Sequence, residues 1–279
     1  MLQISGSLPE PSVRLLHTNG MKGRYIVLSH CWGPVNKQPL KTTQENLREH
    51  HEKIPFLELP KTFQDTVLLS KGIGIEYVWI DSLCIIQHDK EDWELGGNKM
   101  NFVYRNATIV ISASGARHSS EGLFYNERPQ SNNIRLPYII NGVVHGSFHM
   151  APVPPKRTHS YISDGPLTDR AWVLQEWYLS VRLLFFTRNQ IFWKCKELEL
   201  GETGSRENLG LSEKNSWAEL LISYTFKSLT YPSDRLYALR GIVSDMQETT
   251  RRDKFHFEYG VWQEGLTDDL LWWKTEDPT

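Results

Sequence analysis

The sequence has few cysteines and no pattern that pairs them. Cys31, Cys84 and Cys195 are far apart and odd in number, and no Cys-x-x-Cys is present. This argues against a disulfide framework. It also gives no support for a structural zinc site, because zinc ligands come in closely spaced pairs. We therefore expect neither a metal nor a resident cofactor.

Long apolar runs and an excess of basic residues are also missing. No segment approaches the roughly 20 apolar residues of a membrane span, and the N-terminus has no basic start or apolar h-region. The formal net charge is -2, from 31 Lys and Arg against 33 Asp and Glu, which does not favour a nucleic-acid binder. Neither a Walker loop nor Gly-x-Gly-x-x-Gly occurs. We expect a cytoplasmic protein with no membrane span and no nucleic-acid partner.

What is present begins with three apolar runs that end in small polar or acidic residues. They cover 25–29, 77–81 and 107–113, with helical patterns at 61–71 and 89–105 between them. Strands separated by helical crossovers predict a doubly wound parallel sheet. Ligands bind beyond the carboxyl ends of such strands. Ser29, Trp32, Gly33 and Asp81 are therefore candidate ligand-binding residues.

The remaining pattern predicts three parts. Residues 1–24 form a lead-in with a short edge strand near 13–16, residues 25–200 an α/β core, and residues 201–279 a helical extension packed on that core. Within the core, 115–169 is a β-rich insertion with a hairpin turn at Asn141-Gly142. A helix at 170–177 and strands at 182–187 and 190–195 follow, then a polar loop to 215, a helix capped by Ser216 and Glu219, and a helix from about 234 to 246. Gly96-Gly97 predicts a break or kink in the helix at 89–105, because each glycine costs about 1 kcal/mol there.

A nucleophilic cysteine is one enzymatic reading of these residues. Cys31 follows His30 directly, but adjacent residues of a strand face opposite sides, so the two cannot act together without a bulge. A pair of Cys31 or Cys84 with a distant histidine such as His88 stays open.

The motifs together resemble a known family. Their order and spacing are similar to those of the fungal heterokaryon incompatibility (HET) domain over about residues 12–273. The motifs are Leu28-Ser29-His30-Cys31-Trp32-Gly33, Leu59-Pro60-Lys61-Thr62-Phe63-Gln64-Asp65, Trp79-Ile80-Asp81-Ser82-Leu83-Cys84-Ile85-Ile86-Gln87, Asp92-Trp93, 100–107, Gly122-Leu123-Phe124, Arg170-Ala171-Trp172-Val173-Leu174-Gln175-Glu176, Tyr224, Leu229-Thr230, 234–242 and Leu270-Leu271-Trp272. Two departures stand out. Gly96-Gly97 replaces the glutamate and alanine usual in the family, and the chain stops at Thr279, as in a short member or a fragment.

The resemblance implies a role in fungal self/non-self recognition, a form of innate immunity. There the domain executes programmed cell death once a protein partner or partner domain activates it. HET domains have also been linked to TIR domains, some of which hydrolyse NAD. This implies a mainly parallel, TIR/flavodoxin-like sheet, with NAD as a substrate rather than a cofactor. Enzymatic TIR domains place a glutamate four residues after a tryptophan, as Trp172 and Glu176 stand here.

On this view Glu176 is the catalytic carboxylate, and Ser29, Trp32, Gly33, Asp81, Gln87, Arg170, Trp172 and Gln175 bind the nucleotide. Most of them have a structural alternative. Arg170 and Glu176 would form an ion pair or a cap in a structural helix, and Trp32 and Trp172 would fill the core. Asp81 would hold backbone amides in a turn, and Gln87 and Gln175 would order loops. The competing function is a non-enzymatic interaction module that signals through homo-oligomers.

Overall fold

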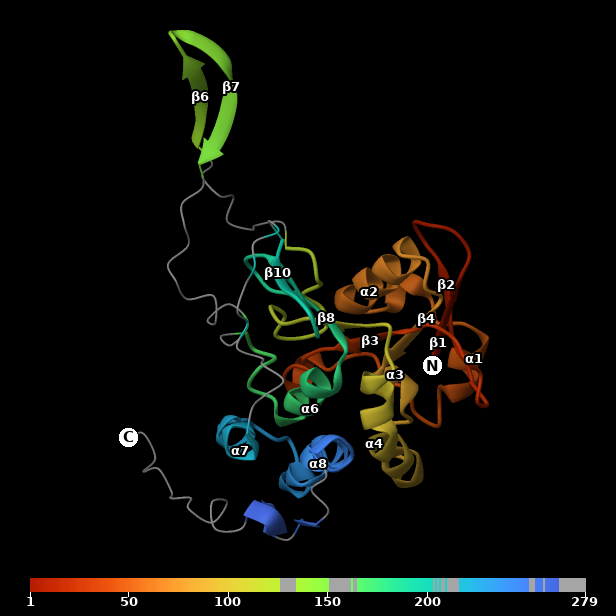
Figure 1. Cartoon of the computed structure of the whole chain (residues 1–279). Coiled ribbons are helices and arrows are strands. Elements are labelled where there is room, and N and C mark those ends of the chain that lie inside the picture. The colour runs from red at the N-terminus through yellow and green to blue at the C-terminus, as the bar shows by residue number, and fades with distance from the viewer. Residues whose placement is uncertain are drawn as a thin grey trace.

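An eight-stranded mixed sheet organises the computed structural model (Figure 1). The structure describes residues 1–125, 134–150, 162, 165–202, 204, 206, 209, 216–250, 254–257 and 259–265. The strand order is β10 (Glu199–Gly201), β9 (Ile191–Cys195), β8 (Arg182–Phe186), β5 (Ile109–Ser112), β3 (Ile26–Ser29), β4 (Tyr77–Ile80), β1 (Leu2–Ser5) and β2 (Ser12–Leu15). The α/β class is confirmed.

The prediction of a mainly parallel sheet is wrong at both flanks. Strands β8, β5, β3 and β4 are parallel, but β9 and β10 on one side and β1 and β2 on the other pair antiparallel. A short turn between neighbouring strands can only reverse the chain, as between β8 and β9, whereas parallel neighbours need a long crossover. The predicted edge strand near 13–16 is confirmed as β2, while β1 and β10 were not predicted.

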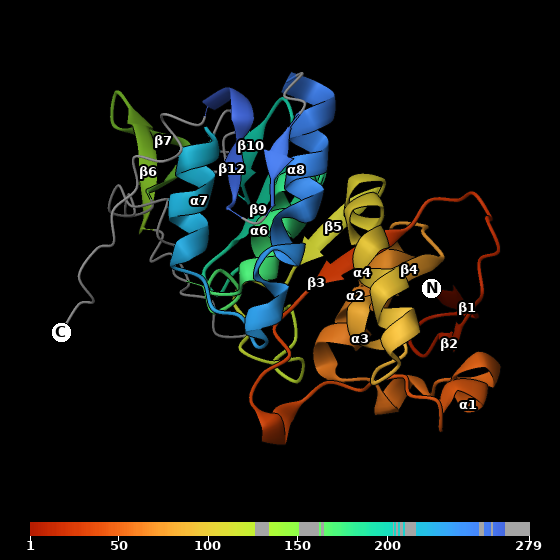
Figure 2. The same ribbon diagram turned by 90° about the horizontal axis from the view of Figure 1, so that it is seen from below.

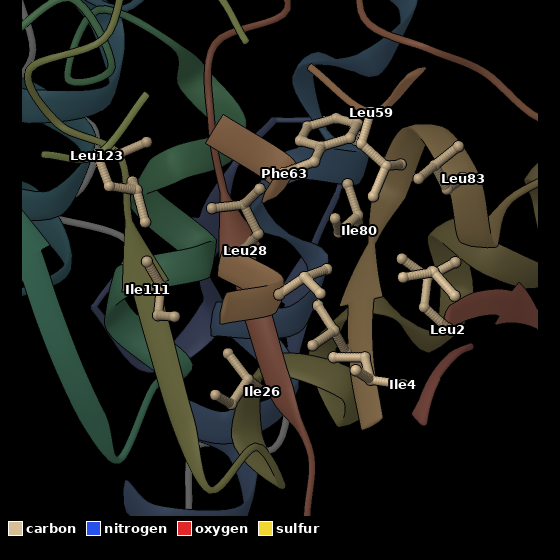
Figure 3. Close-up of a cluster of buried hydrophobic side chains, with 14 of the residues drawn as sticks. Leu2, Ile4, Ile26, Leu28, Leu59, Phe63, Ile80, Leu83, Ile111 and Leu123 are labelled. Carbon is tan, nitrogen blue, oxygen red and sulfur yellow. The ribbon is translucent and has the colours of Figure 1, made fainter. Parts of the chain in front are cut away.

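Helices pack on both faces of the sheet, because alternate residues of each central strand point to opposite sides. The first hydrophobic cluster holds Ile26 and Leu28 of β3 with Phe63 and Val67 of α2 (Lys61–Gly72) (Figure 3). The second cluster holds Val27 with residues of α4 (Lys90–Arg105) and α6 (Ala171–Leu179). Short helices α1 (Leu47–Glu52), α3 (Asp81–Cys84), η1 (Val35–Lys37) and η2 (Phe56–Glu58) lie in the connections.

The C-terminal helices form a further layer outside α4 and α6 (Figures 1 and 2). It comprises α7 (Trp217–Thr225), η3 (Pro232–Arg235), α8 (Tyr237–Thr250), β11 (Phe255–His256), β12 (Val261–Trp262) and η4 (Gln263–Gly265). A third cluster joins Trp217, Ile242 and Trp262 to Ala171 of α6. The capping box of Ser216 and Glu219 is confirmed. Ion pairs from Arg105 of α4 to Asp245 and Glu248 also tie α8 in place.

The predicted hairpin is confirmed as β6 (Ile134–Ile140) and β7 (Val143–Met150). Its turn has φ 48° at Asn141 and φ 80° at Gly142, the two positive values that a type I′ turn needs. The rest of the predicted insertion between 126 and 133 and between 151 and 161 lies outside the described residues. So does the tail from 266 onward.

The predicted break in α4 is wrong, because the helix runs without interruption from Lys90 to Arg105. Packing explains one of the two glycines. A Cβ on Gly96 would lie 3.0 Å from Ile85 Cδ1, whereas a Cβ on Gly97 would meet nothing within 4 Å. Throughout the described part of the chain, every helix is too short or too polar to cross a membrane.

Candidate functional site

The carboxyl ends of the parallel strands meet at one edge of the sheet. The register pairs Ser29 of β3 with Ser112 of β5, and Leu28 with Ile80 of β4. Asp81 follows β4 as the first residue of α3, so the register brings it beside Ser29 at the end of the two strands. Both serines are buried. The strand pairing thus brings together Ser29 and Asp81, which lie more than fifty positions apart in the sequence.

Asp81 links the loop after β3 to the start of α3. Its Oδ2 accepts a hydrogen bond of 2.8 Å from Trp32 Nε1, and its Oδ1 accepts one of 2.7 Å from the Ser82 backbone amide. The Nδ1 of His30 lies 3.7 Å from the same Oδ1. Asp81 therefore holds a backbone amide in the turn, as the structural alternative required, and also orients the indole of Trp32.

His30 and Cys31 face opposite sides of the sheet, as predicted. The His30 ring packs edge-on against Phe63, with centroids 5.0 Å apart, while Cys31 belongs to the second cluster. Burial lowers the pKa of His30 to about 4 and raises the pKa of Cys31 to about 11. The thiol is therefore protonated at neutral pH, which is unsuited to a nucleophile. The Cys84 sulfur accepts a hydrogen bond of 3.4 Å from the Ile80 backbone amide of β4.

Glu176 lies on the inner side of α6, where it is buried at 6% exposure. Burial raises the pKa of its carboxyl group, the Arg170 charge and the hydroxyl groups of Ser29 and Tyr104 lower it, and the Asp81 charge raises it. Among the described residues, neither Glu176 Oε2 nor Ser29 Oγ has a hydrogen-bond partner of ordinary geometry. We call Ser29, Asp81, Tyr104, Arg170 and Glu176 the strand-end site.

Arg170 connects α6 to the loop after β3. It is the N-cap residue of α6, and its Nη1 donates to the backbone carbonyl oxygen of His30. Among the ion pairs of the described residues, none joins Arg170 to Glu176. The guanidinium therefore acts on the carboxyl group through its charge. It also acts on His30, whose pKa it lowers further.

Two predicted ligand-binding residues contact the C-terminal layer, and a third contacts the backbone that follows β4. Gln175 Oε1 accepts a hydrogen bond of 2.7 Å from the Gly241 amide of α8, and Trp172 Nε1 lies 3.4 Å from Asp234 Oδ2. These two side chains hold the C-terminal layer to α6. Gln87 Nε2 donates to the Ile85 carbonyl at 2.8 Å and to the Asp81 carbonyl at 3.4 Å, and so orders the backbone of α3 and the turn after it.

The loop after β3 requires glycine at position 33. Gly33 has φ 81°, and a Cβ there would lie 2.5 Å from His118 Cβ. Both the left-handed backbone and the close approach of the 118 segment exclude a side chain. The neighbouring Trp32 ring faces Lys41 Nζ, which lies 4.9 Å from the ring centroid. Trp32 is thus held by a carboxylate at its nitrogen and a cation over its face.

Two residues of interest were not predicted from the sequence. Tyr104 belongs to the 100–107 motif, where Met100 and Tyr104 stand four apart on the buried side of α4. Their helical spacing was the available signal. Asp65 is buried and accepts a hydrogen bond of 2.8 Å from the Leu123 amide. It joins two motifs that lie far apart in the sequence, and nothing in either one indicates the contact.

One comparison with known proteins gives a match. A sequence model of the family described as "Heterokaryon incompatibility protein (HET)" matches residues 25–176, which is more than half of the chain. The matched range begins just before β3, ends at Glu176 and includes every residue of the strand-end site. No curated protein and no solved structure matches the chain. The chain belongs to the heterokaryon incompatibility protein (HET) family.

Proposed function

We propose that this heterokaryon incompatibility module acts in fungal programmed cell death by hydrolysing a nucleotide such as NAD at the strand-end site. The observation that carries the proposal is the Glu176 carboxyl group. It is buried beside Ser29 at the carboxyl ends of parallel strands, and its Oε2 has no hydrogen-bond partner among the described residues. Such ends are where open α/β sheets bind ligands. A TIR-like mode of action in the cytoplasm is part of the same proposal.

The chemistry needs one carboxylate. The bond from ribose C1′ to the nicotinamide nitrogen breaks with its electron pair going to the nitrogen, which is already cationic, so no general acid is required. The Glu176 carboxylate would stabilise the developing positive charge on the ribose. Water then forms the new bond to C1′ and releases its proton to solvent. Burial raises the pKa of this carboxyl group, whereas Arg170, Ser29 and Tyr104 oppose the rise and favour the ionised carboxylate that this step uses.

Access to the carboxylate requires a change of structure. Glu176 is only 6% exposed, and a nucleotide can contact it only if a covering segment moves. We assign that movement to activation by a protein partner, a partner domain or a second copy of the chain. Activity is then expected to rise when the chain is concentrated or assembled.

The test measures nicotinamide released from NAD by the purified chain, both dilute and with a crowding agent that promotes assembly. Glu176→Gln is expected to reduce release by about 10²-fold or more, the usual loss when an electrostatic stabiliser is removed. Glu10→Gln is the matched control, because Glu10 is exposed in the connection between β1 and β2. Equal release by wild type and Glu176→Gln would overturn the assignment.

A second candidate is a non-enzymatic interaction module. The observation that favours it is a group of exposed aromatic residues on the C-terminal layer, which includes Phe226, Tyr231 and Tyr259. On the same layer, Leu236, Tyr237, Arg240 and Phe257 line a pocket. If wild type releases no nicotinamide in either condition, while Phe226→Asp abolishes assembly, this second function is the better account.

A further inference from the structure

The β6–β7 hairpin projects from the rest of the described chain (Figure 1). None of its residues belongs to the three hydrophobic clusters of the described chain. Six of its large apolar side chains are nevertheless exposed: Tyr138, Ile139, Ile140, Val143, Val144 and Phe148. A lone two-stranded hairpin is at best marginally stable in water. Covering these side chains would therefore stabilise it.

The strand register shows that apolar side chains lie on both faces near the turn. Ile140 pairs with Val143, and Ile139 pairs with Val144. Successive residues of a strand point to opposite faces, so one pair lies on each side. A flat protein surface covers one face of a hairpin only. A lipid leaflet can surround both.

Charge favours a particular lipid surface. The sequence from 128 to 163 contains no Asp or Glu, although the whole chain carries a slight excess of acidic residues. On the hairpin itself, His145 is exposed and Arg135 is half-buried, and Arg135 Nε donates to Ser147 Oγ at 2.8 Å across the two strands. Arg135 lies near the end of β6 that is far from the turn. Basic residues behind an apolar tip match an anionic headgroup layer.

We propose that the β6–β7 hairpin is a membrane-docking element that inserts its apolar turn end into the surface of an anionic lipid bilayer. The tip residues Ile139, Ile140, Val143 and Val144 enter the boundary between headgroups and acyl chains. Arg135 contacts the lipid phosphates. The polar Asn141 at the turn keeps the insertion at interfacial depth, since amide groups are costly to bury in hydrocarbon.

Flotation of the purified chain with vesicles tests the proposal. Vesicles of phosphatidylcholine alone are compared with vesicles that also contain phosphatidylserine. Wild type is expected to bind the second kind more tightly, and less so at high salt. Val144→Asp is expected to weaken binding at least about tenfold, from lost apolar burial and added negative charge. Arg135→Gln is expected to weaken it about fivefold on anionic vesicles only.

Ile222→Asp is the matched control, because Ile222 on α7 is 60% exposed and Val144 is 62% exposed. It should bind anionic vesicles like wild type. The proposal is overturned if wild type binds neither kind of vesicle, if it binds both equally, or if Val144→Asp binds like wild type. Self-association of wild type that Val144→Asp abolishes, without vesicle binding, would instead identify the hairpin as a protein contact and also overturn it.

Discussion

Glu176 and His30 are buried in the same region of the molecule, and burial moves their pKa values in opposite directions. Loss of solvation disfavours the charged form of each group, so the pKa of the acid rises and that of the base falls. The Asp81 charge raises both pKa values, and the Arg170 charge lowers both. The protonation of this region is therefore set by solvation first and by two fixed charges second.

The lowered pKa of His30 predicts an acid-sensitive fold. Its pKa falls from 6.5 in the unfolded chain to about 4 in the native state, so between these values the unfolded state binds more protons. The stability that the uncharged His30 contributes is therefore fully present above pH 6.5, and it is lost as the pH falls to about 4. Between pH 7 and pH 4 we expect the free energy of unfolding to fall by about 2 to 3 kcal/mol less in His30→Gln than in wild type. Urea unfolding at pH 7 and near pH 4 measures the difference.

Glu176 contributes a slope of the opposite sign, because its pKa is raised in the native state and stability falls as the pH rises through that value. Comparing wild type with His30→Gln at each pH cancels this contribution. His256→Gln, at an exposed position in β11, serves as the control and should keep the wild-type slope. A His30→Gln chain that loses as much stability in acid as wild type would contradict the prediction.

At the scale of elements, α6 connects the two halves of the molecule. Its inner side carries Glu176 toward the strand ends, and its other residues meet α8 through the Gln175 hydrogen bond to Gly241. Its first backbone amide, that of Ala171, donates to the Ser228 carbonyl at 3.0 Å. A displacement of the C-terminal layer would therefore be transmitted to the helix that holds the candidate carboxylate.

The two glycines of α4 offer a test of helix packing. Gly97→Ala is expected to stabilise the chain by about 0.5 to 1 kcal/mol, because alanine is the better helix former and the new methyl group meets nothing within 4 Å. Gly96→Ala is expected to gain less, since its Cβ would lie 3.0 Å from Ile85 Cδ1. Urea unfolding at neutral pH measures both. A larger gain in stability from Gly96→Ala than from Gly97→Ala would contradict the prediction and show that the Ile85 side chain moves aside without cost.

At the scale of the whole molecule, three separate hydrophobic clusters stabilise the described part of the chain. Two lie on opposite faces of the sheet and share its strands, while the third joins α7, α8 and β12 to α6 alone. Elements that meet the sheet only through other helices, as the C-terminal layer does through α4 and α6, can open without unfolding it. The C-terminal layer is thus a candidate unit of local unfolding.

Two isoleucines in different clusters test this division. Ile242 in α8 and Ile111 in β5 are both fully buried, and replacing either by alanine is expected to cost about 2 to 5 kcal/mol. Ile242→Ala should speed amide hydrogen exchange in α7 and α8 while β3 and β5 stay protected. Ile111→Ala should speed exchange in the sheet as well. Equal effects of the two variants across all elements would mean that the chain unfolds as one unit.

The sequence by itself determined the features that depend on near neighbours. The helices α2, α4 and α6, the Ser216 capping box and the Asn141-Gly142 turn follow from local pattern, because their hydrogen bonds close within a few residues. The four central strands follow because each is a short continuous apolar run. The opposite facing of His30 and Cys31 follows in the same way from the period of a strand.

Tertiary structure alone decided what depends on distant partners. Strand β1 is only four residues long, and it is defined by pairing with β2 and β4. Helix α6 is apolar nearly all round because it lies between the sheet and α8, so its sequence carries no sign of which face meets which layer. The packing of α8 shows which residues face which layer. Glu176 faces the strand ends, whereas Trp172 and Gln175 face the C-terminal layer.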